Sequence, residues 1–146
     1  MAKFFSLRQA ESLIPEVEAA IREAIALKQQ YATAEIEVQE RARRITMSGG
    51  VSVNLSEMIE LKSRRDQSAG RLKAAVANIH GFGCLVKDLD IGLIDFPTLL
   101  RGEEVYLCWK LGETAIEFWH GVQEGFRGRK KIDQDFLDHH QGELPN

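Results

Sequence analysis

The sequence predicts an α+β protein in which a long antiparallel helical hairpin, preceded by a short helix, is followed by a small antiparallel β meander or hairpin. In the first half of the chain apolar residues recur every seven positions, which is typical of packed helices. After Gly83 the hydrophobic period changes to two, which is typical of strands with one buried face. The change of period marks the boundary between the two halves.

The length and composition favour a single domain. The chain has 146 residues, of which 44% are hydrophobic and 28% are charged, as in ordinary globular proteins. We predict one domain over residues 1–146, with a helical half at 1–80 and a β half at 81–130. Residues 131–146 carry few apolar side chains, so the sequence predicts a mobile tail there.

The charge and the cysteines restrict the function and the compartment. The net charge is −3, and the negative charge is concentrated after residue 80, which disfavours nucleic acid as a partner. Cys84 and Cys108 do not form a disulfide framework or a CxxC motif, and two reduced thiols suit a cytosol. No apolar run resembles a signal peptide or a membrane span. We therefore expect a cytoplasmic protein that is not inserted in a membrane and for which nucleic acid is not the favoured partner.

The first helices are predicted from their caps and their period. Ser6 and Gln9 fit a capping box, so a short helix begins there, and Pro15 should interrupt it at the sequence LIP. A long helix then covers about 15–46. One heptad position of this helix forms an apolar seam made of Val17, Ala24, Tyr31, Val38 and Ile45.

A second long helix is predicted over residues 55–80. Ser48 to Gly50 end the preceding helix, and residues 52–54 offer new N-caps. Two of its heptad positions are apolar, one occupied by Met58, Leu72 and Ile79 and the other by Leu55, Ala69 and Val76. Helices joined by a short loop pack antiparallel, and about 30 residues extend roughly 45 Å. Part of the hairpin should therefore project beyond the β half.

The clearest strand signal lies at residues 104–111, where apolar and polar residues alternate. Residues 112–113 resemble a two-residue turn, and 115–120 resemble the returning strand. Segments 84–89 and 92–96 would complete the meander. This turn pairs Trp109 with Ile116, Leu107 with Phe118, and Tyr106 with Trp119.

The register has two consequences for function. It places Tyr106 and Trp119 together on the face opposite Trp109, where they are either covered or form a contact surface for a partner. It also places Cys108 and His120 on opposite faces of the hairpin. A zinc site built from Cys84, Cys108 and His120 is therefore disfavoured, and we predict that the protein folds without a metal or other cofactor.

The candidate polar site is a set of acidic residues and one histidine in the β half: Asp88, Asp90, Asp95, Glu113 and His120. Such a set can hold a divalent ion or supply an acid and a base. In the calcium or magnesium form, Asp88 and Asp90 bind the ion and Asp95 or Glu113 completes the site. Turns and the rim of the core also explain these residues, and no P-loop, nucleophile elbow or HExxH motif is present.

The β half contains a distinctive series of segments: KDLD (87–90), GLIDFP (92–97), Gly102, VYLCW (105–109), LGE (111–113) and WH (119–120). Together these segments are similar to the signature of a widespread bacterial family known only as a domain of unknown function. The similarity extends to FSL (5–7) and LIPEV (13–17). It implies a small cytoplasmic bacterial protein and brings no activity, cofactor or catalytic residue.

The leading interpretation is a non-catalytic protein-interaction module that binds another protein or a second copy of itself. The contact would use either the helical hairpin, which resembles a coiled coil, or the aromatic β face. The basis of this interpretation is a hairpin longer than its own β unit together with the Tyr106 and Trp119 pair, because exposed apolar surface of this kind is typical of an interface. The alternative is a small enzyme or metal-dependent binder that uses the acidic and histidine set. A third interpretation is phosphate or nucleic-acid contact through the basic residues Arg41, Arg43 and Arg44 and the run at 127–131.

Overall fold

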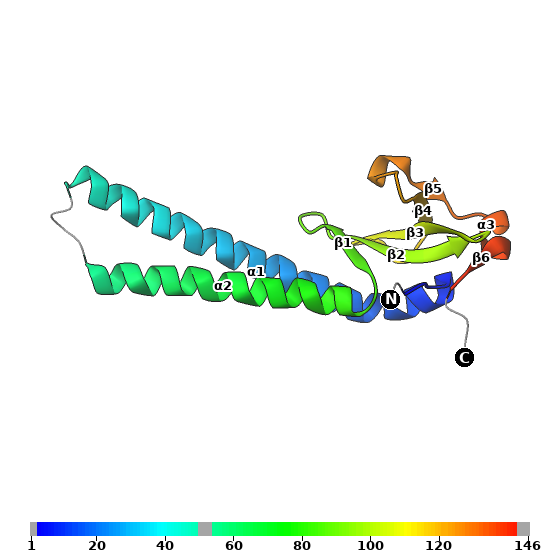
Figure 1. Ribbon diagram of the computed structural model, residues 1–146, viewed down its shortest axis with the longest axis horizontal. Coiled ribbons are helices and arrows are strands. Elements are labelled where there is room, and N and C mark those ends of the chain that lie inside the picture. The colour runs from blue at the N-terminus through cyan, green and yellow to red at the C-terminus, as the bar shows by residue number, and fades with distance from the viewer. Residues whose placement is uncertain (1–2, 50–53, 143–146) are drawn as a thin grey trace.

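The computed structural model describes residues 3–49 and 54–142, and it confirms the predicted α+β fold. A hairpin of two helices, α1 (Leu7–Met47) and α2 (Leu55–Gly81), is followed by an antiparallel sheet (Figure 1). The predicted N-caps at 52 and 53 lie outside the described residues. Asn54 is the N-cap of α2, since its side chain accepts a hydrogen bond from the backbone N–H of Glu57 at 3.1 Å.

Helix α1 begins at the predicted capping box but does not break at Pro15. The Ser6 hydroxyl accepts from the Gln9 N–H at 3.1 Å, and the Gln9 side chain accepts from the Ser6 N–H at 2.9 Å. The predicted short first helix is wrong, because α1 continues through Pro15. Pro15 is exposed, whereas Ala10 and Val17 on either side of it are buried in the core. Packing on both sides of the proline therefore keeps the two segments in one helix.

The seam between the helices is tight near the sheet and loose near the tip. Val17, Ala24 and Val38 of α1 are buried, and Ile79 of α2 is fully buried. Leu55, which the heptad pattern placed in the seam, is 70% exposed. Figure 1 shows the helices separating toward the tip, where the hairpin projects well beyond the sheet as predicted. Leu55, the first residue of α2, is therefore not buried in the seam.

Within residues 3–49 and 54–142 the sheet has six strands. Its order is β1-β2-β3-β4-β5, with β6 paired to β2, and every pairing is antiparallel. The strands are β1 (Leu85–Asp88), β2 (Leu93–Leu100), β3 (Glu103–Lys110), β4 (Phe118–Gly121), β5 (Lys130–Lys131) and β6 (His140–Gln141). A short 3-10 helix, η1 (Phe126–Gly128), precedes β5, and helix α3 (Gln134–His139) precedes β6.

The main core lies between one face of the sheet and the part of the hairpin nearest to it. Ile94 and Phe96 of β2 and Leu107 and Trp109 of β3 are each 0% exposed. They belong to one apolar cluster with residues of the hairpin that include Val17, Ala20, Ile21, Ala24 and Ile79. The opposite face of the sheet points away from the helices, and we call it the outer face.

The predicted register of β3 with β4 is wrong by one residue. Leu107 pairs with Trp119, Tyr106 with His120, and Cys108 with Phe118. A one-residue shift exchanges the two faces of a strand, so Trp119 lies on the core face and packs against Phe136, with ring centroids 5.2 Å apart. Tyr106 stays on the outer face, so the two aromatics do not form a joint contact surface.

The shift arises because residues 111–117 form a longer loop instead of a two-residue turn. The carboxylate of Glu113 accepts from the Lys110 N–H at 2.7 Å, and its backbone carbonyl accepts from the indole N–H of Trp109 at 2.9 Å. Ile116 is then buried, with its N–H donating to Glu11 of α1 at 3.3 Å. The chain therefore reaches the core before it joins β4.

The segment after residue 131, for which the sequence predicted a mobile tail, contains α3 and β6. Phe136 is 1% exposed, and the ring of His140 stacks on it at 5.2 Å. The Nε2 atom of His140 accepts from the N–H of Leu7 at 3.0 Å. These contacts attach the end of the described chain to the first turn of α1.

Candidate functional site

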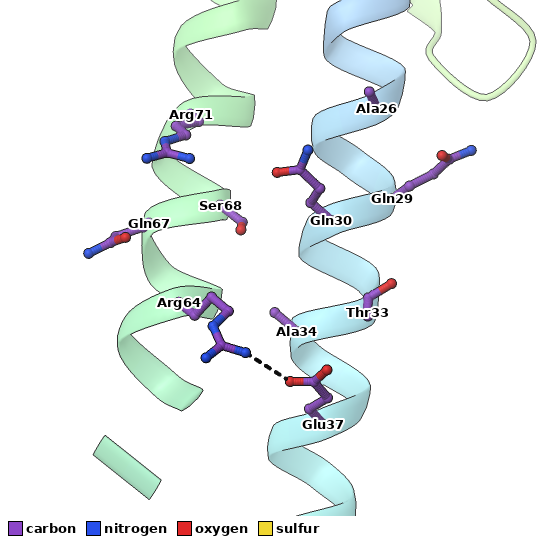
Figure 2. A pocket seen from close by; sticks show the side chains of 10 residues that line it. All are labelled: Ala26, Gln29, Gln30, Thr33, Ala34, Glu37, Arg64, Gln67, Ser68 and Arg71. Atoms are coloured by element: carbon purple, nitrogen blue, oxygen red, sulfur yellow. Dashed lines mark hydrogen bonds and ion pairs between the residues drawn. The ribbon is translucent and has the colours of Figure 1, made fainter. Parts of the chain in front are cut away.

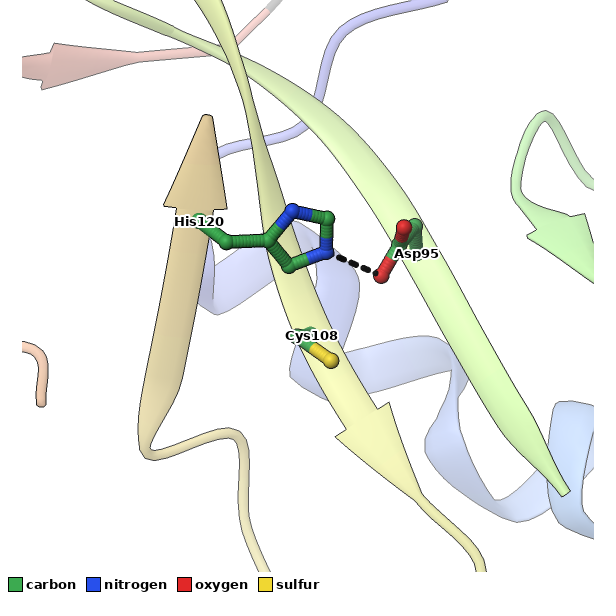
Figure 3. Close-up of side chains that lie close together, drawn as sticks. All are labelled: Asp95, Cys108 and His120. Atoms are coloured by element: carbon green, nitrogen blue, oxygen red, sulfur yellow. Dashed lines mark hydrogen bonds and ion pairs between the residues drawn. The ribbon is translucent and has the colours of Figure 1, made fainter. Parts of the chain in front are cut away.

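Three side chains from three neighbouring strands meet on the outer face of the sheet. They are Asp95 of β2, Cys108 of β3 and His120 of β4 (Figure 3). Asp95 pairs directly with Cys108, and His120 pairs with Tyr106, two residues from Cys108. All three therefore share one face, contrary to the prediction that Cys108 and His120 point in opposite directions. One ligating atom of each lies within 4.8 Å of the other two.

The cluster is buried although it faces away from the helices. Asp95 is 1% exposed, Cys108 0% and His120 3%. The ring of Tyr106 packs edge-on against the imidazole at 5.5 Å, and the Lys87 ammonium lies 4.9 Å from the centre of that ring. Burial removes water from these polar groups, so each needs a partner within the protein.

The hydrogen bonds of His120 define where a proton must lie. Its Nδ1 is 2.8 Å from the backbone carbonyl of Gly121, which only accepts, so Nδ1 carries hydrogen. Its Nε2 is 3.0 Å from Oδ1 of Asp95, and this contact needs a proton between the two atoms. Burial raises the pKa of Asp95, while the hydrogen bond from His120 opposes the rise. The pair therefore shares one proton.

The thiol of Cys108 is not an activated nucleophile. Burial raises its pKa to about 12, and the negative charge of Asp95 adds to the effect. A thiol of this kind is protonated at neutral pH, whereas catalytic cysteines have lowered pKa values. Nucleophilic catalysis by Cys108 is therefore disfavoured. A metal ion, in contrast, displaces the proton of a coordinating thiol outright.

The arrangement fits a transition-metal ion. Zinc bonds of about 2.0 to 2.3 Å in a tetrahedral site place ligand atoms roughly 3.3 to 3.8 Å apart. The separation of 3.0 Å between Asp95 and His120, and the limit of 4.8 Å for the cluster, require only small movements. The bond from Nδ1 to the Gly121 carbonyl also fixes the ring so that Nε2 faces Asp95, and an outer-shell bond of this kind would orient Nε2 as a metal ligand.

The predicted polar site is divided among three places. Asp95 and His120 belong to the cluster, but Asp88, the last residue of β1, and Asp90, in the turn that follows, are both exposed. There the Asp88 carboxylate accepts from the Asp90 N–H at 3.0 Å, and Asp90 forms an ion pair with Lys28. Glu113 instead binds Arg129. The predicted calcium or magnesium set of Asp88, Asp90 and Asp95 or Glu113 is therefore not assembled.

Cys108 was absent from the predicted polar site, although the sequence contains a signal for it. The β2–β3 connection is a two-residue turn in which Arg101 and Gly102 have φ values of 51° and 84°. A two-residue turn of this kind fixes the pairing of the strands, and here it places Asp95 opposite Cys108. In the sequence, this turn is indicated by Gly102, because glycine readily adopts a positive φ.

A second concave feature lies between α1 and α2 (Figure 2). It is a polar groove of about 480 Å³ lined by Ala26, Gln29, Gln30, Thr33, Ala34, Glu37, Arg64, Gln67, Ser68 and Arg71. Arg64 forms an ion pair with Glu37 at 3.5 Å, and both side chains are about half exposed, at 56% and 44%. The charged groups of this groove are therefore open to solvent, unlike the buried polar groups of the outer-face cluster.

The fold and the cluster together define a class: a small α+β protein with a projecting helical arm and a sheet that carries a buried Asp-Cys-His cluster. The chain belongs to the family described as "Uncharacterized conserved protein (DUF2203)", whose model matches residues 3–132. This confirms the similarity to a domain of unknown function. A search of curated proteins and a search of solved structures each gave no match. Among the described residues, no helix is both long and apolar enough to cross a membrane.

Proposed function

We propose that this protein binds a divalent transition-metal ion through Asp95, Cys108 and His120. The observation that carries the proposal is the meeting of three different ligating groups, each at most 3% exposed, within 4.8 Å on one face of the sheet. Side chains from three strands of one sheet are held by backbone pairing, which gives a prearranged site. Three protein ligands leave one coordination position for another molecule.

The ligand types select the class of ion. Thiolate and imidazole favour zinc and the neighbouring transition metals, whereas calcium and magnesium prefer oxygen ligands alone. A thiolate and a carboxylate also balance the two charges of the ion, so the loaded site is neutral. A neutral centre is compatible with the burial of this cluster, because an unbalanced charge there would be costly.

Binding should release protons. The ion replaces the thiol proton of Cys108 and the proton shared by Asp95 and His120, about two protons in all. Affinity should therefore rise with pH across the neutral range. A calorimetric titration repeated in buffers of different ionisation enthalpy measures this release directly.

The test is a cobalt titration of the purified protein, followed by zinc competition. We expect one ion per chain, with the absorption of a thiolate-to-cobalt charge transfer. Cys108→Ser should abolish that absorption, and Asp95→Asn and His120→Gln should weaken binding. Cys84→Ser is the matched control, because Cys84 is also buried but its thiol donates to the Ile79 carbonyl at 3.4 Å in the core.

Two results would reject the proposal. One is the absence of cobalt and zinc binding by folded wild-type protein. The other is binding that Cys108→Ser and Asp95→Asn leave unchanged, which would place the ion elsewhere on the chain.

A second, independent proposal concerns the projecting arm. Four large apolar side chains on it are exposed: Met47 by 76%, Leu55 by 70%, Ile59 by 67% and Ile36 by 55%. Exposed apolar surface of this kind supports contact with a second copy of the chain, because a twofold axis brings the same surface of both copies together. Light scattering should give a dimer that Leu55→Ser with Ile59→Ser converts to monomer. A monomeric wild-type protein would reject this proposal.

A further inference from the structure

We propose that Arg129 is a positioning residue of the metal centre, whose guanidinium stabilises the Cys108 thiolate that forms when the ion binds. This inference rests on the metal-binding function proposed above. It assigns a role to a buried cation that lies outside the ligand set, and it arises from the contacts of that cation.

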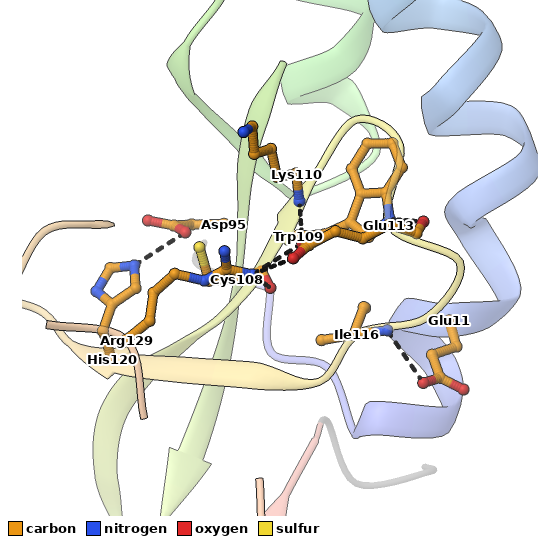
Figure 4. Close-up of polar contacts among 9 residues, drawn as sticks. All are labelled: Glu11, Asp95, Cys108, Trp109, Lys110, Glu113, Ile116, His120 and Arg129. Atoms are coloured by element: carbon orange, nitrogen blue, oxygen red, sulfur yellow. Dashed lines mark hydrogen bonds and ion pairs between the residues drawn. The ribbon is translucent and has the colours of Figure 1, made fainter. Parts of the chain in front are cut away.

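Arg129 follows η1 and precedes β5, and its side chain is only 10% exposed. It extends across the outer face to β3, where Nη2 lies 3.4 Å from the backbone carbonyl of Cys108. Figure 4 shows the guanidinium of Arg129 beside Cys108. A positive charge is therefore held next to the residue that would become a thiolate.

Three groups from separate segments fix this position. Both carboxylate oxygens of Glu113 lie 2.8 Å from Nη2 of Arg129. The guanidinium also lies over the ring of Phe118 at 4.1 Å and near the ring of Phe126 at 4.9 Å. An arginine held by a carboxylate and stacked on aromatic rings loses most of its rotamer freedom. Arg129 is therefore preorganised.

The Nε atom of Arg129 is a buried donor that has no hydrogen-bond partner. Such groups are uncommon in folded proteins and call for an explanation. Nη2 already donates to Glu113 and to the Cys108 carbonyl, whereas Nε remains available to donate to a further acceptor. A metal-bound Cys108 thiolate is a much stronger acceptor than the thiol form, whose sulfur accepts only weakly, because the sulfur becomes negatively charged.

The charges are consistent with this role. Glu113 neutralises Arg129 in the absence of the ion, so the pair tolerates its burial. The loaded centre is itself neutral, but its charge is unevenly distributed, with negative charge on sulfur. A neighbouring guanidinium favours that distribution without competing for the ion, since arginine remains protonated and does not ligate metals.

The experiment compares Arg129→Gln, Arg129→Lys and the control Arg127→Gln, which removes an exposed charge two residues away. Cobalt affinity is measured by competition with a chelator, together with the energy of the thiolate-to-cobalt band. Arg129→Gln should weaken binding by about 10- to 100-fold, as outer-shell changes do, and shift the band. Arg129→Lys should recover part of the affinity because it keeps the charge. Arg127→Gln should match wild type in both readouts.

The outcomes separate this inference from the proposed function. If wild type binds cobalt through Cys108 and Arg129→Gln retains its affinity and spectrum, Arg129 has no such role and metal binding stands. If wild type binds no cobalt, the proposed function itself fails. Should Arg129→Gln not fold, Glu113→Gln serves instead, since it keeps the arginine but loosens its anchor. For Glu113→Gln, a band shift with a loss of affinity smaller than that expected for Arg129→Gln supports the role of Arg129. An unchanged affinity and an unchanged band overturn it.

Discussion

At the scale of single residues, the outer-face cluster shows how far strand pairing can be predicted. The turn at Arg101 and Gly102 is sufficient to place Asp95 opposite Cys108. His120 could not be placed in the same way, because Glu113 bonds to Lys110 and Trp109 and extends the following loop. Two hydrogen bonds accepted by one loop residue, one by its side chain and one by its backbone carbonyl, thus decided which face carries the histidine.

The raised pKa of Asp95 predicts a pH dependence of stability. Its carboxyl holds a proton more tightly in the folded chain than in the unfolded chain, because burial disfavours the charged form. The contribution of this proton to the stability of the folded state is therefore complete below the ordinary pKa range of a carboxyl group. It is lost as the pH rises through the raised pKa. Asp95→Asn carries no such proton.

We therefore expect the stability of metal-free Asp95→Asn to improve relative to wild type as the pH rises through that range. Urea unfolding of both proteins at a series of pH values, with chelator present, measures the difference. A constant difference at all pH values would show that the Asp95 pKa is the same in folded and unfolded protein.

At the scale of elements, helix signals in the sequence were reliable where they were local. The capping box at Ser6 and the N-cap at Asn54 are both formed, since each involves residues three apart. Pro15 was misleading because its effect depends on packing distant in sequence. Ala10 and Val17 are both 0% exposed against the sheet, and that burial exceeds the cost of one lost helical hydrogen bond.

The continuity of α1 predicts that Pro15→Ala stabilises the protein. A proline inside a helix costs about 3 kcal/mol relative to alanine, and its rigidity in the unfolded chain returns about 0.4 to 1 kcal/mol. We expect a net gain of about 2 kcal/mol in the free energy of unfolding, measured by denaturant titration. Glu16→Ala, at the adjacent exposed position, should change it by less than about 0.5 kcal/mol. No gain for Pro15→Ala would indicate that the helix is interrupted there in solution.

The helix seam is tested by two substitutions two residues apart in α1. Val38 is 6% exposed and Ile36 is 55% exposed. Val38→Asp places a charge in an apolar contact and should lower the free energy of unfolding by about 2 to 4 kcal/mol. Ile36→Asp should change it by less than about 0.5 kcal/mol. Equal losses would mean that another surface covers Ile36, as the proposed arm-to-arm contact would if it includes this residue.

At the scale of the whole molecule, the projecting arm could be predicted from helix length alone. The packing of residues 133–142 against the start of α1 could not. Residues 133–142 are mostly polar, so their composition resembles a tail. Their attachment depends on a few contacts: the burial of Phe136, the hydrogen bond from Leu7 to His140, and the pairing of β6 with β2. Composition averages over such contacts and misses them.

Gly142 lies at the point where the end of the described chain meets the capping box of α1. A Cβ at this position would lie 2.2 Å from the backbone N of Ser6 and 2.4 Å from Oε1 of Gln9. Since the Ser6 N–H and the Gln9 side chain are bonded to each other, neither can move without breaking the cap. Gly142→Ala should therefore detach the segment or open the first turn of α1, lowering the free energy of unfolding by about 1 to 3 kcal/mol.

Gly125→Ala is the control for this substitution, because nothing lies within 4 Å of a Cβ at Gly125. Hydrogen exchange adds a local readout. In Gly142→Ala the amide of Leu7, which donates to His140, should exchange faster than in wild type. The amide of Leu107, in the central strand β3, should exchange as slowly as it does in wild type. Unchanged protection of Leu7 would mean that the C-terminal segment does not close on α1. The first turn of α1 would then be held by its capping box and by Phe5, whose N–H donates to the Pro97 carbonyl at 2.7 Å.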